Sequence, residues 1–192
     1  MAHGTRETEI KLAFPDVKAA RQRLRAVGFR VVKRRVLEVN TVYDTPGLAL
    51  RDAATLLRVR RAGSVGTLTY KGRPDDSKHK SREELEVKVS DPHRMGVILE
   101  RLGFHAAFVY EKYRTEFRQP GRGGIATIDE TPIGAYVELE GSPAWIDRTA
   151  RRLGFSEKDY INVSYGRLYL DWCRQHGVEP ADMVFGDRPK RT

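Results

Sequence analysis

The chain has 192 residues, of which 40% are hydrophobic and 32% charged, and this composition is typical of a globular domain with a buried core. A net charge of +9 indicates an anionic partner, either nucleic acid or a compact polyanion. No apolar run approaches a membrane span, the first residues lack the apolar core of a signal peptide, and a single cysteine excludes an internal disulfide. We therefore expect a cytoplasmic protein without membrane association.

Strand and helix patterns alternate along the chain. Apolar and polar residues alternate in eight segments, which are predicted to be strands: 5–13, 35–44, 55–62, 66–72, 81–89, 108–118, 124–130 and 135–141. Three segments combine helical apolar spacing with a proline at the start and a glycine at the end: 15–28, 92–103 and 143–154. A fourth helix is expected over 165–176. We expect one domain over 1–177 and a loosely held tail over 178–192.

The charged residues of the predicted strands fall on one face. Residues i, i+2 and i+4 of a strand share a face, so Glu7, Glu9 and Lys11 lie opposite Ile10 and Leu12. The same spacing recurs in the later strands, at Arg58 and Arg60, Thr69 and Lys71, Arg82, Glu84 and Glu86, Lys112 and Arg114, Asp129, and Glu138 and Glu140. The sheet therefore has a charged face of mixed sign and an apolar face for the helices to cover.

Two arrangements satisfy this pattern. In an open sheet the charged face is exposed to solvent, and each exposed ion pair contributes only about 0–1 kcal/mol to the stability of the fold. In a closed sheet of roughly eight strands, the charged face lines a tunnel that can hold a small ligand. Burying unpaired charges costs several kcal/mol per ion, so a tunnel requires mixed signs, water, metal ions and a highly charged ligand. The pattern by itself leaves both arrangements open.

Ordered motifs favour the tunnel. The stretch from Glu7 to Lys11 has the form E-x-E-x-K, which by itself is a weak signal. Seven further motifs follow it in order: VYDT at 42–45, LRVR at 57–60, LTYKG at 68–72, REELE at 82–86, EKYR at 111–114, IDE at 128–130 and VELE at 137–140. Together, from Glu7 to Tyr169, they resemble the CYTH family, also called triphosphate tunnel metalloenzymes, and in particular its branch containing class IV adenylyl cyclases. The resemblance implies an α+β fold: an eight-stranded antiparallel β-barrel, open at both ends, with helices packed on its outer face.

The resemblance also implies a site that binds a triphosphate with Mg²⁺ or Mn²⁺. Hard cations prefer carboxylate oxygens, and the implied metal ligands are Glu7, Glu9, Asp129, Glu138 and Glu140. Arginine and lysine suit phosphate oxygens, and the implied triphosphate-binding residues are Lys11, Arg58, Arg60, Lys71, Arg82, Lys112 and Arg114. For catalysis, Glu84 or Glu86 would orient a water molecule, or Lys71 would act as the base. Lys11, Lys112 and Glu86 could equally be internal ion-pair partners.

Three functions remain open at this point. Hydrolysis of tripolyphosphate, thiamine triphosphate or ATP is favoured, because no adenine pocket is evident and Gly4-Thr5-Arg6 replaces the His-Phe element of some class IV cyclases. The second is a class IV adenylyl cyclase, which converts ATP to cyclic AMP and pyrophosphate. The third is a non-catalytic module that binds polyphosphate or RNA. Nucleic acid is the weaker expectation, because a phosphate-binding stripe is more often free of carboxylates.

The histidines and the cysteine carry no chemistry in this interpretation. Cys173 falls in an apolar helical pattern and is expected in the core. The five histidines lack metal-ligand spacing and are all interpreted as surface or loop residues: His3, His79, His93, His105 and His176.

Overall fold

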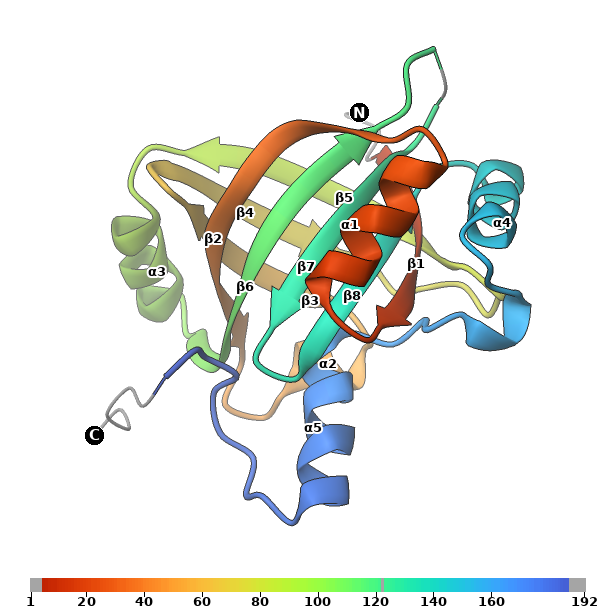
Figure 1. Cartoon of the computed structure of the whole chain (residues 1–192). Helices are drawn as coiled ribbons and strands as arrows, with labels where there is room; N and C mark the ends of the chain where they lie inside the picture. The colour runs from red at the N-terminus through yellow and green to blue at the C-terminus, as the bar shows by residue number, and fades with distance from the viewer. Residues whose placement is uncertain (1–4, 122, 187–192) are drawn as a thin grey trace.

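The computed structural model describes residues 5–121 and 123–186, and over these residues eight strands close into an antiparallel barrel with helices outside it (Figure 1). The order around the barrel is β1-β5-β4-β3-β2-β6-β7-β8. The strands are β1 (Thr5–Phe14), β2 (Arg30–Asp44), β3 (Leu56–Ala62), β4 (Val65–Lys71), β5 (Lys80–Val89), β6 (His105–Arg118), β7 (Ile125–Thr131) and β8 (Gly134–Glu140). This architecture confirms the predicted α+β barrel.

The helices are the predicted four, together with two short turns that the sequence did not indicate. The elements are α1 (Val17–Ala26), α2 (Ala49–Asp52), α3 (Pro92–Arg101), α4 (Pro143–Arg152), η1 (Glu157–Asp159) and α5 (Tyr165–His176). The side chains of Asp16, Asp91 and Ser142 cap α1, α3 and α4 by accepting a backbone hydrogen bond. These caps confirm the start signals. The α2 and η1 turns span four and three residues, too few for a helical period to show in the sequence.

Two strands begin earlier than expected. The predicted boundaries of 35 for β2 and 108 for β6 are wrong, because the strands begin at Arg30 and His105. The pairing of β2 with β6 shifts register between Val31 and Lys33 and again before Val36. Each shift breaks the two-residue alternation on which the prediction relied.

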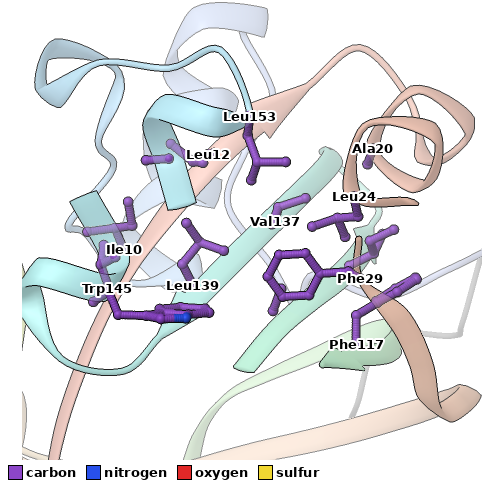
Figure 2. Packing of buried hydrophobic residues seen from close by; sticks show 14 residues of the cluster. Ile10, Leu12, Ala20, Leu24, Phe29, Phe117, Val137, Leu139, Trp145 and Leu153 are labelled. Atoms are coloured by element: carbon purple, nitrogen blue, oxygen red, sulfur yellow. The ribbon is translucent and has the colours of Figure 1, made fainter. Parts of the chain in front are cut away.

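The main apolar core lies outside the barrel, between its wall and two helices. Helices α1 and α4 pack against β1 and β8, and Leu24 of α1 and Leu153, just after α4, lie near Val137 of β8 (Figure 2). Trp145 of α4 packs at one side of this cluster, with its indole ring against the backbone of Gly124. A Cβ atom at position 124 would lie only 2.5 Å from the ring, so only glycine fits there. The outward residues of the strands are therefore the apolar ones, as predicted.

The other helices cover the remaining wall and one end of the barrel. Helix α3 packs on β3, β4 and β6, and the buried ring of Tyr43 lies against Gly96 beneath it. Helix α5 lies below one end of the barrel in Figure 1, where Tyr165 and Tyr169 pack with Tyr110. Tyr43 is therefore part of the outer packing.

The segment after α5 is attached more firmly than expected. Met183 is 1% exposed and forms backbone hydrogen bonds with Val109 and Glu111, beside the part of β6 that β7 does not reach. Within the predicted tail, the hydrogen bonds of Asp182, Met183 and Phe185 attach this part of the chain to β6, and residues 187–192 lie outside the described part of the chain. Cys173 is buried, as predicted. Among the described residues, no helix is both long and apolar enough to cross a membrane.

Candidate active site

The charged faces of the strands point into the barrel, where they surround a cavity. Strand register brings opposite charges together: Glu7 pairs across from Arg82 and Lys11 from Glu138. The cavity contains about 730 Å³ of space free of protein atoms, including its parts open to solvent. Its lining residues are Glu7, Glu9, Lys11, Leu56, Arg58, Arg60, Lys71, Lys80, Arg82, Glu84, Glu86, Tyr110, Lys112, Arg114, Glu138, Glu140, Ser164 and Tyr165. The closed arrangement is thus the one that forms.

The cavity is positively charged overall. Among the described residues, eight lysine and arginine side chains line it against six glutamates. Lys11 is 2% exposed and Arg58 5%, so these charges are held away from bulk water. An excess of buried positive charge makes the cavity suitable for a compact anion, because the anion would offset the cost of burying like charges.

Two cavity-lining glutamates of β1, Glu7 and Glu9, are held by lysines. The Glu9 carboxylate lies 3.2 Å from Lys11 Nζ and 3.5 Å from Lys80 Nζ. Burial raises the pKa of Glu9, but the attraction of Lys11 and Lys80 outweighs it and holds that pKa well below the usual range. Glu7 pairs with Lys71, and Lys71 also lies 3.1 Å from Glu84. Glu9 is therefore ionised at neutral pH.

Asp129 occupies a different place from the other expected metal ligands. It is fully buried and does not line the cavity. Arg114 donates to both of its oxygens, at 2.7 and 2.6 Å, Lys112 donates at 2.7 Å, and the Tyr165 hydroxyl donates at 2.8 Å. Asp129 thus lies behind Arg114 and Lys112, and it orients their charges toward the cavity.

Arginines on β3 and β5 retain hydrogen-bonding capacity. Arg58 donates to the Tyr110 hydroxyl at 3.1 Å and to Thr69 at 3.3 Å, and Arg60 donates to Asn40 at 3.1 Å. The buried Nε atoms of Arg58 and Arg82 have no hydrogen-bond partner among the described residues. Unsatisfied buried donors are costly, which is consistent with a site built for an anion that brings acceptor oxygens.

Like charges crowd together at two places in the cavity. Burial and the negative charges of Glu7 and Glu84 raise the pKa of Glu140 to about 7. Burial and the neighbouring Arg58 lower the pKa of Arg60. Crowded carboxylates favour a cation and crowded guanidinium groups favour an anion, so the cavity combines the chemistry of a metal site with that of a phosphate site.

The carboxylates suit a divalent cation in their chemistry, although they are not already gathered around one point. Oxygen donors are the ligands that Mg²⁺ and Mn²⁺ prefer. Burial and the repulsion of Glu7 and Glu84 raise the pKa of Glu140, and a cation would relieve that repulsion. Within residues 5–121 and 123–186, no group of three acidic, histidine or cysteine side chains is close enough to hold a metal ion. Glu7 and Glu9 would therefore exchange a lysine partner for the metal.

Apart from Asp129, every residue expected in the site lines the cavity, and several lining residues were missed. Lys80 and Tyr110 lie two residues before Arg82 and Lys112 on the inward faces. Lys80 falls one residue before the predicted strand 81–89, whereas Tyr110 lies inside the predicted strand 108–118 and carries no charge to mark it. Glu38 lies just behind the lining, 3.6 Å from Arg60. Tyr165 comes from α5, and no local pattern shows that this helix reaches the barrel.

The fold and the site together define a family. Residues 5–165 match the CYTH domain, and the chain belongs to the CYTH family. Over 173 residues it is 31% identical to a "putative adenylate cyclase" of Methanocaldococcus jannaschii, a match covering 84% of this chain and 97% of that protein.

Solved structures agree with this fold. The PH1819 protein of Pyrococcus horikoshii OT3 has a TM-score of 0.73 and 25% identity, and the match covers 86% of this chain and 99% of that one. A "putative adenylyl cyclase" of Hippeastrum, described as having a dominant triphosphatase activity, has a TM-score of 0.60 and 21% identity, with 91% and 97% of the two chains covered.

Proposed function

We propose that this protein is a metal-dependent hydrolase that binds an inorganic or organic triphosphate inside the barrel. The observation that carries the proposal is the presence of two like-charge clusters in one cavity, one of carboxylates around Glu140 and one of guanidinium groups around Arg60. A triphosphate with a divalent cation supplies both missing charges at once. Neither a bare anion nor a bare metal ion would neutralise both clusters.

The metal is assigned to the cavity-lining glutamates: Glu7, Glu9, Glu138 and Glu140. Mg²⁺ or Mn²⁺ bound there would offset the charge of the phosphate oxygens and lower the pKa of a bound water. Asp129 is assigned a different role from the one that the family resemblance implies. Both of its oxygens are engaged by Arg114, so it holds that guanidinium in place for the ligand.

The phosphate chain is assigned to the cationic side chains of the cavity: Lys11, Arg58, Arg60, Lys71, Lys112, Arg82 and Arg114. Arginine forks bind phosphate oxygens in pairs, whereas lysine supplies a point charge. Lys11 already lies 3.2 Å from Glu9 and 3.4 Å from Glu138. It therefore serves both as an ion-pair partner and as a phosphate contact.

Among the expected catalytic groups, Glu84 is the best base. Burial and the nearby Glu7 raise the pKa of Glu84, which brings it closer to neutrality and makes it a better proton acceptor. The pKa of Glu86 is lowered despite its burial, because Thr69 donates to it at 2.7 Å and Arg60 lies near. Lys71 is held by Glu7 and Glu84, which favours phosphate binding over a role as the base.

Adenylyl cyclase activity is the second candidate. Its support is the name of the Methanocaldococcus jannaschii relative, which covers nearly the same length of chain. The Hippeastrum protein, with a cyclase name and a dominant triphosphatase activity, illustrates that one barrel of this kind can carry a hydrolytic reaction. In both reactions the phosphate chain would occupy the same cavity, and the position of the attacking oxygen would differ.

One experiment separates the candidates. The purified protein is incubated with tripolyphosphate, thiamine triphosphate or ATP, each with Mg²⁺, Mn²⁺ or a chelator, and the products are identified by chromatography. Metal-dependent phosphate release is expected. Cyclic AMP with pyrophosphate would establish the cyclase instead, and binding without any product would leave a non-catalytic polyphosphate or RNA module.

A further inference from the structure

His79 is a buried histidine on the outside of the barrel, next to a cavity residue. It lies in the loop before β5, as the prediction of a surface or loop position allows, but its side chain is only 5% exposed. It precedes Lys80, the first residue of β5, and successive side chains of an extended chain point to opposite sides. His79 therefore points outward, toward α4, while Lys80 points into the cavity.

Three elements meet at the His79 ring. Its Nε2 atom lies 2.8 Å from Oδ1 of Asp147 on α4. The hydroxyl of Tyr160, just after η1, donates to the same oxygen at 3.0 Å, and the two rings lie 5.9 Å apart. Lys78 donates to the other Asp147 oxygen at 2.9 Å. Burial raises the pKa of Asp147, but the hydrogen bonds from Lys78, His79 and Tyr160 outweigh it and lower that pKa to about 2.

This network lies where β1 stops pairing with β5 and begins to pair with the segment after η1. β5 pairs with β1 only as far as Lys80, opposite Glu9, and beyond it Lys11 forms two backbone hydrogen bonds with Ile161. Asn162 donates to the Lys78 carbonyl at 2.7 Å, and this bond joins the segment after η1 to the loop before β5. The start of β5 thus depends on side-chain contacts with α4 and the segment after η1.

Lys80 is placed to contact a ligand. It lines the cavity, is 7% exposed and has its Nζ 3.5 Å from the Glu9 carboxylate. We propose that Lys80 contacts the phosphate chain and that His79, Asp147 and Tyr160 are positioning residues that hold Lys80 in the cavity. The ligand contact rests on the proposed function, whereas the positioning does not.

The first test measures the position of Lys80 without any ligand. Lysines are acylated with an N-hydroxysuccinimide ester, and the labelling rate of each is read by peptide mass spectrometry. His79→Ala should label Lys80 at least about tenfold faster, because its protection depends on local order at the start of β5. His79→Gln should restore protection, since its amide can donate to Asp147. Lys88, exposed on the same strand, should label equally in every variant.

Matched variants keep this test decisive. His93→Ala removes an exposed histidine of α3 and should leave Lys80 protected. If circular dichroism shows that His79→Ala does not fold, Tyr160→Phe carries the test, because it removes only the hydroxyl and should still speed labelling. Unchanged labelling of Lys80 in a folded His79→Ala or Tyr160→Phe variant would overturn the positioning role.

The second test measures tripolyphosphate affinity by calorimetry in the presence of Mg²⁺. Lys80→Met should weaken binding about tenfold and His79→Ala about fivefold, and the double variant should be no weaker than Lys80→Met alone. If the loss of affinity in the double variant equalled the product of the two single losses, His79 would not act through Lys80. Faster labelling in a protein that does not bind tripolyphosphate would refute the proposed function and the ligand role of Lys80, while supporting the positioning network.

Discussion

Ile10 and Lys11 are neighbours on β1, and both are almost completely buried, at 0% and 2% exposure. Ile10 faces outward into the apolar cluster under α1 and α4, whereas Lys11 faces inward between Glu9 and Glu138. Burying Ile10 removes apolar surface from water, at roughly 25 cal/mol per Å². Burying Lys11 costs desolvation, and its ion pairs with Glu9 and Glu138 are needed to outweigh that cost and raise its pKa.

This comparison extends to the whole barrel. The outer face is an ordinary core that stabilises the fold, and the inner face is a set of paired charges, of a kind that apolar residues often replace without loss of stability. A charged interior that does not stabilise the protein indicates a role in binding. The two faces should therefore respond differently to substitution, in activity on the inside and in stability on the outside.

The largest expected effect is on the inside. Glu9→Gln keeps the shape of the side chain and removes the charge needed at the proposed metal site, so metal-dependent phosphate release should fall by about a thousandfold or more. The thermal transition followed by circular dichroism should remain cooperative. Glu83→Gln, on the exposed outer side of β5, is the matched control. Retained activity in Glu9→Gln would remove Glu9 from the metal site.

On the outside, Phe29→Ala should act on stability alone. Phe29 is 2% exposed within the cluster of Figure 2, and truncating a buried phenylalanine costs about 3–5 kcal/mol in the free energy of unfolding. Urea titration measures this loss, and Val31→Ala, at a residue 38% exposed, serves as the control. A loss of tripolyphosphate affinity in the folded variant would show that the two faces are coupled.

Arg60 and Arg61 offer a direct comparison across one peptide bond. Arg60 lines the cavity and Arg61 is exposed on the opposite face of β3. Arg60→Ala should weaken triphosphate binding by roughly 2–5 kcal/mol, and Arg61→Ala should leave it within the error of calorimetry. A loss below about 0.5 kcal/mol for Arg60→Ala would mean that this guanidinium does not contact the ligand.

The smallest effect concerns the carboxylate cluster in the absence of metal. The folded pKa of Glu140 is raised to about 7, above its usual 4.5, so the folded state binds this proton more tightly than the unfolded state. Stability should therefore be highest below pH 4.5 for this group and decline as pH rises through 7. Glu140 also reaches solvent, which limits the change to about 1 kcal/mol.

Thermal melting in a chelator at pH 5 and pH 8 measures this change. The drop in melting temperature between the two pH values should be smaller in Glu140→Gln than in the unmodified protein. An equal drop in melting temperature in both proteins would show that the charges of Glu7 and Glu84 do not raise the pKa of Glu140.

Much of the site could be predicted from the sequence because strand periodicity is local. Once residues 7, 9 and 11 share a face, the same rule places Arg58 with Arg60 and Glu138 with Glu140, and the structure has all of them around the cavity. The rule fails where a strand continues past its regular pattern, which is why Lys80 was missed, and a charge pattern does not mark an uncharged lining residue such as Tyr110. Strand periodicity also does not show how deeply an inward side chain is buried, so Asp129 was predicted to line the cavity like its neighbours.

Local sequence patterns were sufficient to predict which side of each strand is charged, where the main helices begin and end, and the family to which the chain belongs. Only the tertiary structure decided which charges meet, because partners such as Lys11 and Glu138 lie far apart in the chain and are joined by barrel closure. The same holds for His79, whose environment comes from Asp147 and Tyr160 on distant elements. Periodicity is encoded within a few residues, whereas burial and charge pairing depend on what the rest of the chain brings to the same place.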